Sequence, residues 1–495
     1  MPRVNNSFAL FTATGRILAM VAGFLMPIFL TRYLTQENYG LYFQFNVLIG
    51  FMSRIFSFGM QSNLFYYFPN SNEIRQKALV GNTYCTLIVF AIVALVLLLI
   101  PTTAKIFVGN NKLVDFSILV AVGIFFTVPV MLVYPLFVTR GDKTVSVLYP
   151  PLETLLRVGI VIGAALVFKT IEAILFSILV YHIIQFVFLT FYASWPYRKV
   201  EGNWFDWDLL KSQFIYAAPF GLAVILNTIF QRFDKMLCIS FISPQEYAIY
   251  SLAFYGIPGV FQVYESVGEV NILNMSAAYK ENNLKETISL AQSYVTRLMS
   301  FSVPIILGVC VFANVIFDFL FPPEYAKAIT FFRIYVFSFV IGAFGAGLVL
   351  RATGKTKLTL KAYLRSAVVF MPFAYFSIKY YGTWGAIATA MLGYLLPKIF
   401  QISFEMKILN ISFWQYLPWK KILIITFLSL LLIIPVAVLN LYAKLNIFVA
   451  GGIGLVYVLV VWLIELKKGL FIVSKDTLMN YLTKIKVNIK KKIYR

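Results

Sequence analysis

Cysteine and histidine are nearly absent from this chain, and their scarcity excludes two kinds of site. There are three cysteines and one histidine among 495 residues. The cysteines, Cys85, Cys238 and Cys310, each lie alone in an apolar stretch without paired spacing. The single histidine is His182. We therefore expect no disulfide framework, no His/Cys metal site and no bound metal or other cofactor.

Charged residues are also scarce. They make up 13% of the chain, whereas a soluble protein carries about 25%. Hydrophobic residues make up 60%, and the mean hydropathy is +0.83. This composition is typical of a polytopic membrane protein, whose helices need about 20 apolar residues each to cross a hydrocarbon layer roughly 30 Å thick.

Two features that would indicate an enzyme, a phosphate loop of an ATPase and a soluble domain, are missing. The sequence "TGKT" at 353–356 resembles a phosphate loop, but Val349 stands where that motif requires its first glycine. The longest loops expected inside the chain, 193–212 and 273–292, are too short for a soluble domain. A membrane glycosyltransferase or polymerase would need such a domain, a large outer loop or a catalytic carboxylate. We therefore expect a protein that is not an enzyme.

The apolar stretches predict fourteen transmembrane helices. Most Lys and Arg residues fall in segments that lie on one side if both termini are cytoplasmic, which predicts a multi-pass membrane protein with that orientation. The tail 467–495 carries nine positive charges. Attraction to anionic lipids explains this tail better than nucleic-acid binding, which we do not expect. The expected spans are 10–33, 40–61, 79–101, 115–138, 145–168, 171–193, 213–242, 247–272, 293–321, 328–350, 358–379, 383–405, 420–440 and 446–465.

An internal repeat predicts the domain organisation. The sequence "YLTQENYGLY" at 33–42 matches "FISPQEYAIY" at 241–250, and two weaker matches follow in the same order at nearly the same offset. Two lobes of six helices related by an axis along the membrane normal would give this pattern. We therefore expect an all-α protein with an N-terminal lobe (1–206), a C-terminal lobe (207–410), and two further helices with the basic tail (411–495).

Several segments resemble one family. They are an amphipathic N-terminal start, "RYLTQENYGLY" from 32, "FGM" from 58, "FDKMLCISFISPQEYAIYSLAF" from 233 and "RATGKTK" from 351. They are similar to the polysaccharide-transporter branch of the multidrug/oligosaccharidyl-lipid/polysaccharide exporter superfamily, the flippases of undecaprenyl-linked O-antigen or capsule repeat units. The resemblance implies a V-shaped pair of lobes around a cavity that opens alternately to either side. It also implies a location in the bacterial inner membrane, a lipid-linked oligosaccharide as substrate, and a polymerase and a chain-length regulator as partners. We expect a monomer.

Basic side chains fall inside the expected spans more often than carboxylates at comparable depth. A charge at the bilayer centre costs about 2.5–3.5 kcal/mol, so such residues usually face the protein interior or a water-filled cavity. An excess of cations there would attract an anion, and a lipid pyrophosphate is the obvious one because guanidinium groups bind phosphate bidentately. In the related lipid II flippases, arginines of the first two helices matter for transport, and this adds weight to Arg16 and Arg54. The candidate substrate-binding residues are Arg16, Arg54, Arg157, Arg232, Lys235 and Arg365.

For these basic residues a plainer interpretation is that several anchor helices or extend to the membrane surface. Arg333 is an example, because it lies about one turn from the outer end of its expected span. Sequence alone leaves both interpretations open.

Three carboxylates are candidates for ion coupling or for linking helices. Asp234 has no basic residue at i±3 or i±4 in its own helix, so we expect it to need a cation from another helix, or a proton. Glu265 and Glu269 are spaced i, i+4 and therefore share one helix face. They either form a proton or Na⁺ site or face Lys and Arg of the next cytoplasmic loop.

The function that these observations favour is the flipping of an undecaprenyl-pyrophosphate-linked oligosaccharide, the repeat unit of an O-antigen, capsule or exopolysaccharide, coupled to H⁺ or Na⁺ or uncoupled. A multidrug exporter of the same superfamily is an alternative, although an excess of positive charge would repel organic cations. A lipid II flippase is a further alternative.

Overall fold

The computed structural model describes residues 23–108, 112–257, 259–443 and 445–471, and every regular element within these ranges is a helix. This confirms the all-α prediction. The chain divides into two compact units. Unit 1 comprises residues 1–251 and 374–386, and unit 2 comprises residues 252–373 and 387–495. The predicted lobe boundaries at 206 and 410 stay a prediction.

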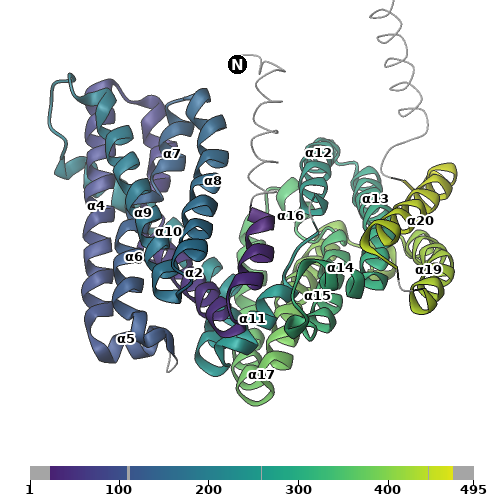
Figure 1. Ribbon diagram of the computed structural model, residues 1–495. Helices are drawn as coiled ribbons and strands as arrows, with labels where there is room; N and C mark the ends of the chain where they lie inside the picture. The colour runs from purple at the N-terminus through teal and green to yellow at the C-terminus, as the bar shows by residue number, and fades with distance from the viewer. Residues whose placement is uncertain (1–22, 109–111, 258, 444, 472–495) are drawn as a thin grey trace, which may run out of the picture. The chain divides into compact units, whose positions relative to one another are not determined.

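Unit 1 is built around long helices that lie side by side, with α6 against α4 and α9, and α8 against α9 (Figure 1). Helix α2 contacts both α6 and α10. The helices of this unit are α2 (Gln36–Phe56), α3 (Asn63–Tyr67), α4 (Glu73–Leu99), α5 (Pro101–Val108), α6 (Ser117–Val130), α7 (Val133–Thr139), α8 (Lys143–Val167), α9 (Ile171–Ser194) and α10 (Trp207–Phe241), together with most of α11 (Pro244–Ala253).

A sharp break follows α2. Phe58 and Gly59 have positive φ angles of 48° and 62°, and the short helical segment after them turns by 59° from the direction of α2. Helix α10 crosses this break closely, because a Cβ on Gly221 would lie 2.2 Å from the carbonyl oxygen of Phe58. Only glycine fits such a crossing. The break therefore holds the end of α2 against α10.

The two copies of the repeated turn lie against each other at the starts of α2 and α11, both in unit 1. The Gln245 amide donates to the Glu37 carboxylate at 2.9 Å, and these residues are 208 positions apart, the same offset as the two turn sequences. A Cβ on Gly40 would lie 1.8 Å from the carbonyl oxygen of Pro244. The backbones of the two turns are thus in direct contact.

In unit 2, α13 is the central helix, with α12, α15, α19 and α20 packed against it. Buried apolar side chains of α12, α13 and α19 form its largest core cluster. The helices of this unit are α12 (Val260–Lys280), α13 (Leu284–Val311), α14 (Ala313–Leu320), α15 (Ala328–Ala343), α16 (Leu348–Ala352), α18 (Phe413–Tyr416), α19 (Trp419–Tyr442) and α20 (Ile447–Lys467), with most of α17 (Thr356–Leu409).

A fully buried carboxylate fixes the break between α15 and α16. Glu405 accepts hydrogen bonds from the backbone N–H groups of Val349 at 2.8 Å and Leu350 at 3.2 Å, and from the Tyr416 hydroxyl at 2.6 Å. Burial and the neighbouring Glu405 raise the pKa of Tyr416 well above its ordinary value, so this hydroxyl remains a donor. The carboxylate therefore has donors that compensate for its burial.

Among the described residues, nine helices are long and apolar enough to span a membrane, or ten if the bent pair that begins with α2 is one span. The prediction of fourteen is larger for identifiable reasons. Helix α17 counts once here but covers two expected spans, joined at Gly382 with φ 53°. Helices α10 and α12 carry several charged residues, and the expected span 10–33 begins outside the described residues. The exact number stays a prediction.

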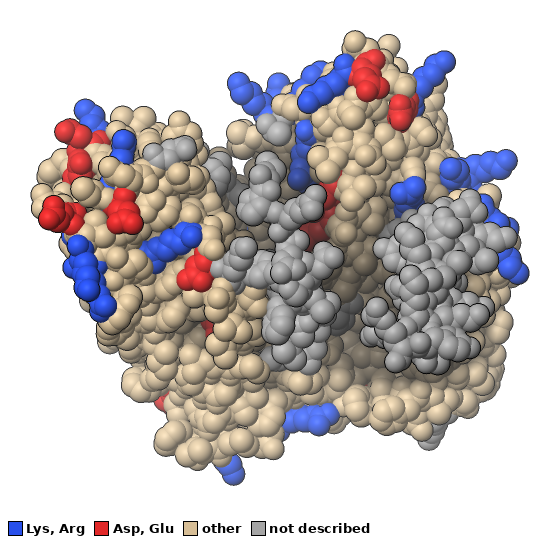
Figure 2. Space-filling model, turned by 90° about the horizontal axis from the view of Figure 1, so that it is seen from above, with Lys and Arg blue, Asp and Glu red and all other residues tan. Residues whose placement is uncertain are grey.

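Charged side chains occupy separate places on the face seen in Figure 2, and most of the visible surface of each unit is uncharged.

Candidate functional site

A polar stripe runs along α2. Tyr42, Asn46, Gly50 and Arg54 follow one another at intervals of four residues and therefore share one face of the helix. The Asn46 amide donates to the carbonyl oxygen of Tyr42 at 2.8 Å. Arg54 lies in the last turn, where the negative end of the helix dipole favours a cation, and its side chain is exposed.

Arg232 of α10 lies beside this stripe. A Cβ on Gly50 would be 3.7 Å from a guanidinium nitrogen of Arg232, so the absence of a side chain at position 50 leaves room for the arginine. Arg232 is half-buried and interacts electrostatically with Arg54. Two like charges from different helices are thus neighbours, and neither forms an ion pair with a carboxylate among the described residues.

Arg157 of α8 approaches the same helix further along. It interacts electrostatically with Tyr42 of α2 and with Tyr181 of α9. Its Nε is buried without a hydrogen-bond partner in the described part of the chain. One turn earlier on α8, Glu153 accepts a hydrogen bond of 2.5 Å from Tyr181 rather than pairing with Arg157.

The rise of 1.5 Å per residue gives the spacing of these arginines along α2. Arg232 lies beside Gly50, and Arg157 interacts with Tyr42. Gly50 and Tyr42 are about 12 Å apart along the helix. Arg54 is about 6 Å beyond Gly50. The stretch of α2 from Tyr42 to Arg54, near which unit 1 places these three arginines, is about 18 Å long.

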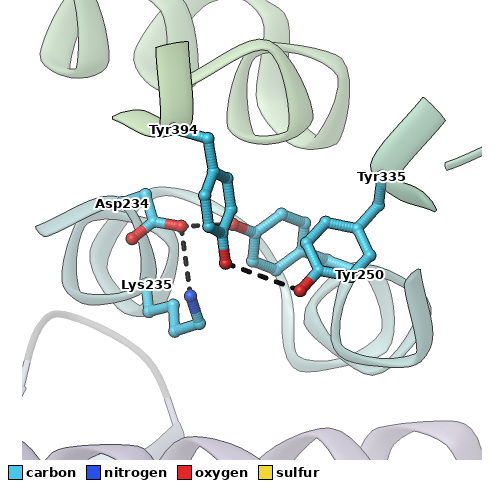
Figure 3. Close-up of polar contacts among 5 residues, drawn as sticks. All are labelled: Asp234, Lys235, Tyr250, Tyr335 and Tyr394. Carbon is cyan, nitrogen blue, oxygen red and sulfur yellow. Dashed lines mark hydrogen bonds and ion pairs between the residues drawn. The ribbon is translucent and has the colours of Figure 1, made fainter. Parts of the chain in front are cut away.

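Asp234 is buried, and two side chains contact its carboxylate (Figure 3). The Tyr250 hydroxyl of α11 donates to its carboxylate at 2.7 Å, and the Lys235 amine lies 3.4 Å from the same oxygen. The partner from another helix is thus a hydroxyl group rather than the expected cation, while the cation comes from the next residue of α10. The link between α10 and α11 exists, and its role in transport stays a prediction. Figure 3 also draws Tyr335 and Tyr394, whose hydroxyl groups are 3.5 Å apart within unit 2.

The remaining candidates lie elsewhere. Arg16 falls outside the described residues. Arg365 belongs to unit 2, is exposed and places its guanidinium 5.1 Å from the centre of the Phe404 ring. Glu265 and Glu269 are exposed on α12 of unit 2, and neither forms an ion pair with a described residue. Whether these groups bind substrate or an ion stays a prediction.

Arg333, for which sequence left two interpretations open, has structural partners near the start of α15. Its Nε donates to the carbonyl oxygen of Cys310 at 3.0 Å, and another nitrogen donates to the Asn314 side chain at 3.3 Å. These contacts favour the anchoring interpretation.

Sequence alone did not identify two buried carboxylates of unit 2, Glu405 and Glu465. Each lies at the end of an apolar stretch close to lysines, where a solvated position is the ordinary expectation. Glu465 also lies in the last turn of its helix, where the helix dipole disfavours negative charge. That position was the available signal that its environment is unusual.

The fold is that of a multi-pass helical membrane protein. A family model described as "Polysaccharide biosynthesis protein" matches residues 29–330, and the chain belongs to this family. The resemblance noted in the sequence is thereby confirmed. No curated protein matches the sequence significantly.

Solved structures share the fold at low sequence identity. The lipid II flippase MurJ in an inward closed conformation has a TM-score of 0.73 and 13% identity, over 94% of this chain and 99% of that one. An inward-facing multidrug resistance MATE family transporter of the MOP superfamily has a TM-score of 0.58 and 14% identity, over 79% of this chain and 94% of that one. These matches show that the chain shares the fold of these two membrane proteins.

Proposed function

We propose that this chain is a flippase that moves an undecaprenyl-pyrophosphate-linked oligosaccharide across the bacterial inner membrane. The substrate is the repeat unit of an O-antigen, capsule or exopolysaccharide, and it travels from the inner to the outer leaflet. No covalent bond is made or broken, so the protein is not an enzyme. Family membership supports the polysaccharide pathway, and the fold supports transport.

The observation that carries the proposal is the neighbouring pair Arg54 and Arg232. Arg232 also interacts with the Asp234 carboxylate, but the two guanidinium groups repel each other, and a bound anion would remove this repulsion. A pyrophosphate offers oxygens to both groups, and bidentate guanidinium contacts are strong and directional. Arg157 of α8, which lies near a different turn of α2, would bind the same headgroup at another stage of transport. An organic cation would be repelled here, which disfavours a multidrug exporter.

An ion gradient can set the direction of transport. Asp234, Glu265 and Glu269 are the candidates for binding H⁺ or Na⁺. Glu265→Gln tests this in proteoliposomes, where ion-driven transport should fall. Transport that keeps its full dependence on the gradient would exclude this residue as the coupling site.

Lipid II flipping is the second candidate function, because the matching MurJ fold belongs to a lipid II flippase and lipid II also carries a pyrophosphate. Deletion separates the two functions. Loss of the polysaccharide flippase should leave lipid-linked repeat units on the inner leaflet and remove surface glycan while the cells grow. Arrest of cell-wall synthesis with intact surface glycan would instead support lipid II.

The deletion strain also tests the arginine pair. The wild-type chain should restore surface glycan, whereas Arg54→Ala combined with Arg232→Ala should leave repeat units on the inner leaflet at normal protein level. Arg198→Ala is the matched control, because Arg198 lies after α9 with its guanidinium 3.7 Å from the Trp195 ring centre. Full activity of the double variant would refute the proposed site.

A further inference from the structure

Glu465 is a carboxyl group that the transport proposal does not use. It has 0% exposure, and both carboxylate oxygens lack a hydrogen-bond partner in the described part of the chain. It continues the buried face of α20 formed by Tyr457 and Val461 at intervals of four residues. This face packs on α13 and α19.

The register of the three helices shows which charged groups are near. Phe301 of α13 stacks on Trp462, with ring centres 5.5 Å apart, and a Cβ on Gly308 would lie 3.7 Å from the Tyr457 ring. Helices α13 and α20 are therefore antiparallel, and the turn of α13 before Phe301 lies level with Glu465. On the other side, Tyr457 donates to the carbonyl oxygen of Ser429 in α19 at 2.9 Å.

None of the cations at this level compensates for a buried negative charge. All of them are exposed, and no ion pair joins Glu465 to a residue that the structure describes. Helix α14, which also contacts α20, carries a single carboxylate, the exposed Asp318 near its far end. The cations in question are Arg297 on α13, Lys420 and Lys421 on α19, and Lys467 and Lys468 on α20.

Three physical effects disfavour an ionised Glu465. Burial removes the hydration of the carboxylate, and no donor replaces it. The group lies in the last turn of α20, at the negative end of the helix dipole. Glu405 shows the contrast, since it is equally buried but accepts two backbone N–H groups and a tyrosine hydroxyl. A neutral acid fits the surroundings of Glu465, whereas a carboxylate fits those of Glu405.

We propose that Glu465 holds a proton in the folded protein and that this proton makes the packing of the α19–α20 hairpin on α13 depend on pH. Loss of the proton would create a buried charge, which needs water or a cation. The hairpin would then have to loosen. The packing of the hairpin is therefore complete at low pH, where the acid is neutral, and weakens as the pH rises.

Labelling with dicyclohexylcarbodiimide, which attacks protonated carboxyl groups in apolar surroundings, tests the proton. In the full-length protein in nanodiscs at pH 7, we expect mass spectrometry to find at least tenfold more label on Glu465 than on Glu405. The label on Glu465 should decrease as the pH rises. Equal labelling of the two residues, or labelling of Glu405 alone, would overturn the proposal.

Infrared spectroscopy supplies a second measurement that does not depend on access of the reagent. A protonated carboxyl band should be present in the wild-type protein, absent in Glu465→Gln and retained in Glu405→Gln. An unchanged spectrum in Glu465→Gln would show that Glu465 is ionised, through a partner outside the described residues, and would refute the proposal.

Thermal unfolding across pH tests the consequence for packing. Glu465→Gln replaces a neutral acid by a neutral amide of similar shape, so its stability at about pH 4, below the ordinary pKa of a glutamate, should match that of the wild type. As the pH rises to 9, the wild type should lose stability relative to the variant. Parallel curves for the two proteins would contradict a pH-dependent hairpin.

Discussion

The hydrogen bond from Tyr250 to Asp234 offers a prediction with an internal control. Tyr250→Phe removes the hydroxyl that donates to this buried carboxylate at 2.7 Å and leaves the Lys235 amine 3.4 Å from it. Hydrogen bonds to charged groups contribute about 1.5–3 kcal/mol. Because 1.4 kcal/mol corresponds to a factor of ten, local opening of α10 from α11 should become about 10- to 150-fold more frequent.

Tyr247→Phe is the matched control for this variant. Tyr247 is on the same helix and is also fully buried, but its hydroxyl has no hydrogen-bond partner among the described residues. Removal of an unsatisfied buried hydroxyl is neutral or stabilising. The two variants thus lose the same atom from the same helix with opposite expected results.

Cys238 provides the assay. It is 0% exposed and lies one helical turn after Asp234, so a thiol reagent reaches it only when the region opens. With Cys85→Ala and Cys310→Ala removing the other thiols, the rate of alkylation reports local opening directly. Tyr250→Phe should raise this rate and Tyr247→Phe should not. Equal rates for the two variants would refute the argument that the hydrogen bond holds α10 to α11.

Three further predictions concern stability in detergent, measured by thermal unfolding. Gly40→Ala should destabilise the protein by about 1–3 kcal/mol, because the added Cβ would overlap the Pro244 carbonyl. Gly451→Ala, whose Cβ would have no atom within 4 Å, should be neutral or stabilising. Equal melting points for the two variants would contradict the close contact at Gly40. Gln213→Leu should cost about 1–3 kcal/mol because the buried Asn63 loses a donor at 2.8 Å, and an unchanged melting point would argue against this network. Glu405→Gln should also cost about 1.5–3 kcal/mol, since its amide cannot accept all three donors, and a fully stable variant would show that the cap of α16 is unimportant.

The helical membrane fold could be predicted because its cause is local. A stretch such as Glu73–Leu99 is apolar almost throughout, and a bilayer permits few backbone arrangements other than a helix for it. The repeated turn was equally visible, and Glu37 and Gln245, which correspond in the repeat, proved to be in contact.

The partners of buried polar groups could not be predicted, because they come from distant positions. Asp234 is bound by a hydroxyl 16 residues away, beyond the end of its helix. Glu405 accepts from backbone groups about 55 residues earlier, which no side-chain pattern marks. The proximity of Arg232 to α2 likewise depends on Gly50, a small residue in an otherwise ordinary apolar segment.

The central claim, that Arg54 and Arg232 hold a lipid pyrophosphate, is tested most directly by native mass spectrometry of the purified protein with undecaprenyl pyrophosphate and undecaprenyl monophosphate. The wild type should prefer the pyrophosphate. Each alanine substitution should weaken its binding by about 10- to 150-fold, the equivalent of one charge-assisted hydrogen bond of about 1.5–3 kcal/mol. Equal affinity of the wild type for the two lipids, or unchanged pyrophosphate binding in the double variant, would contradict the account.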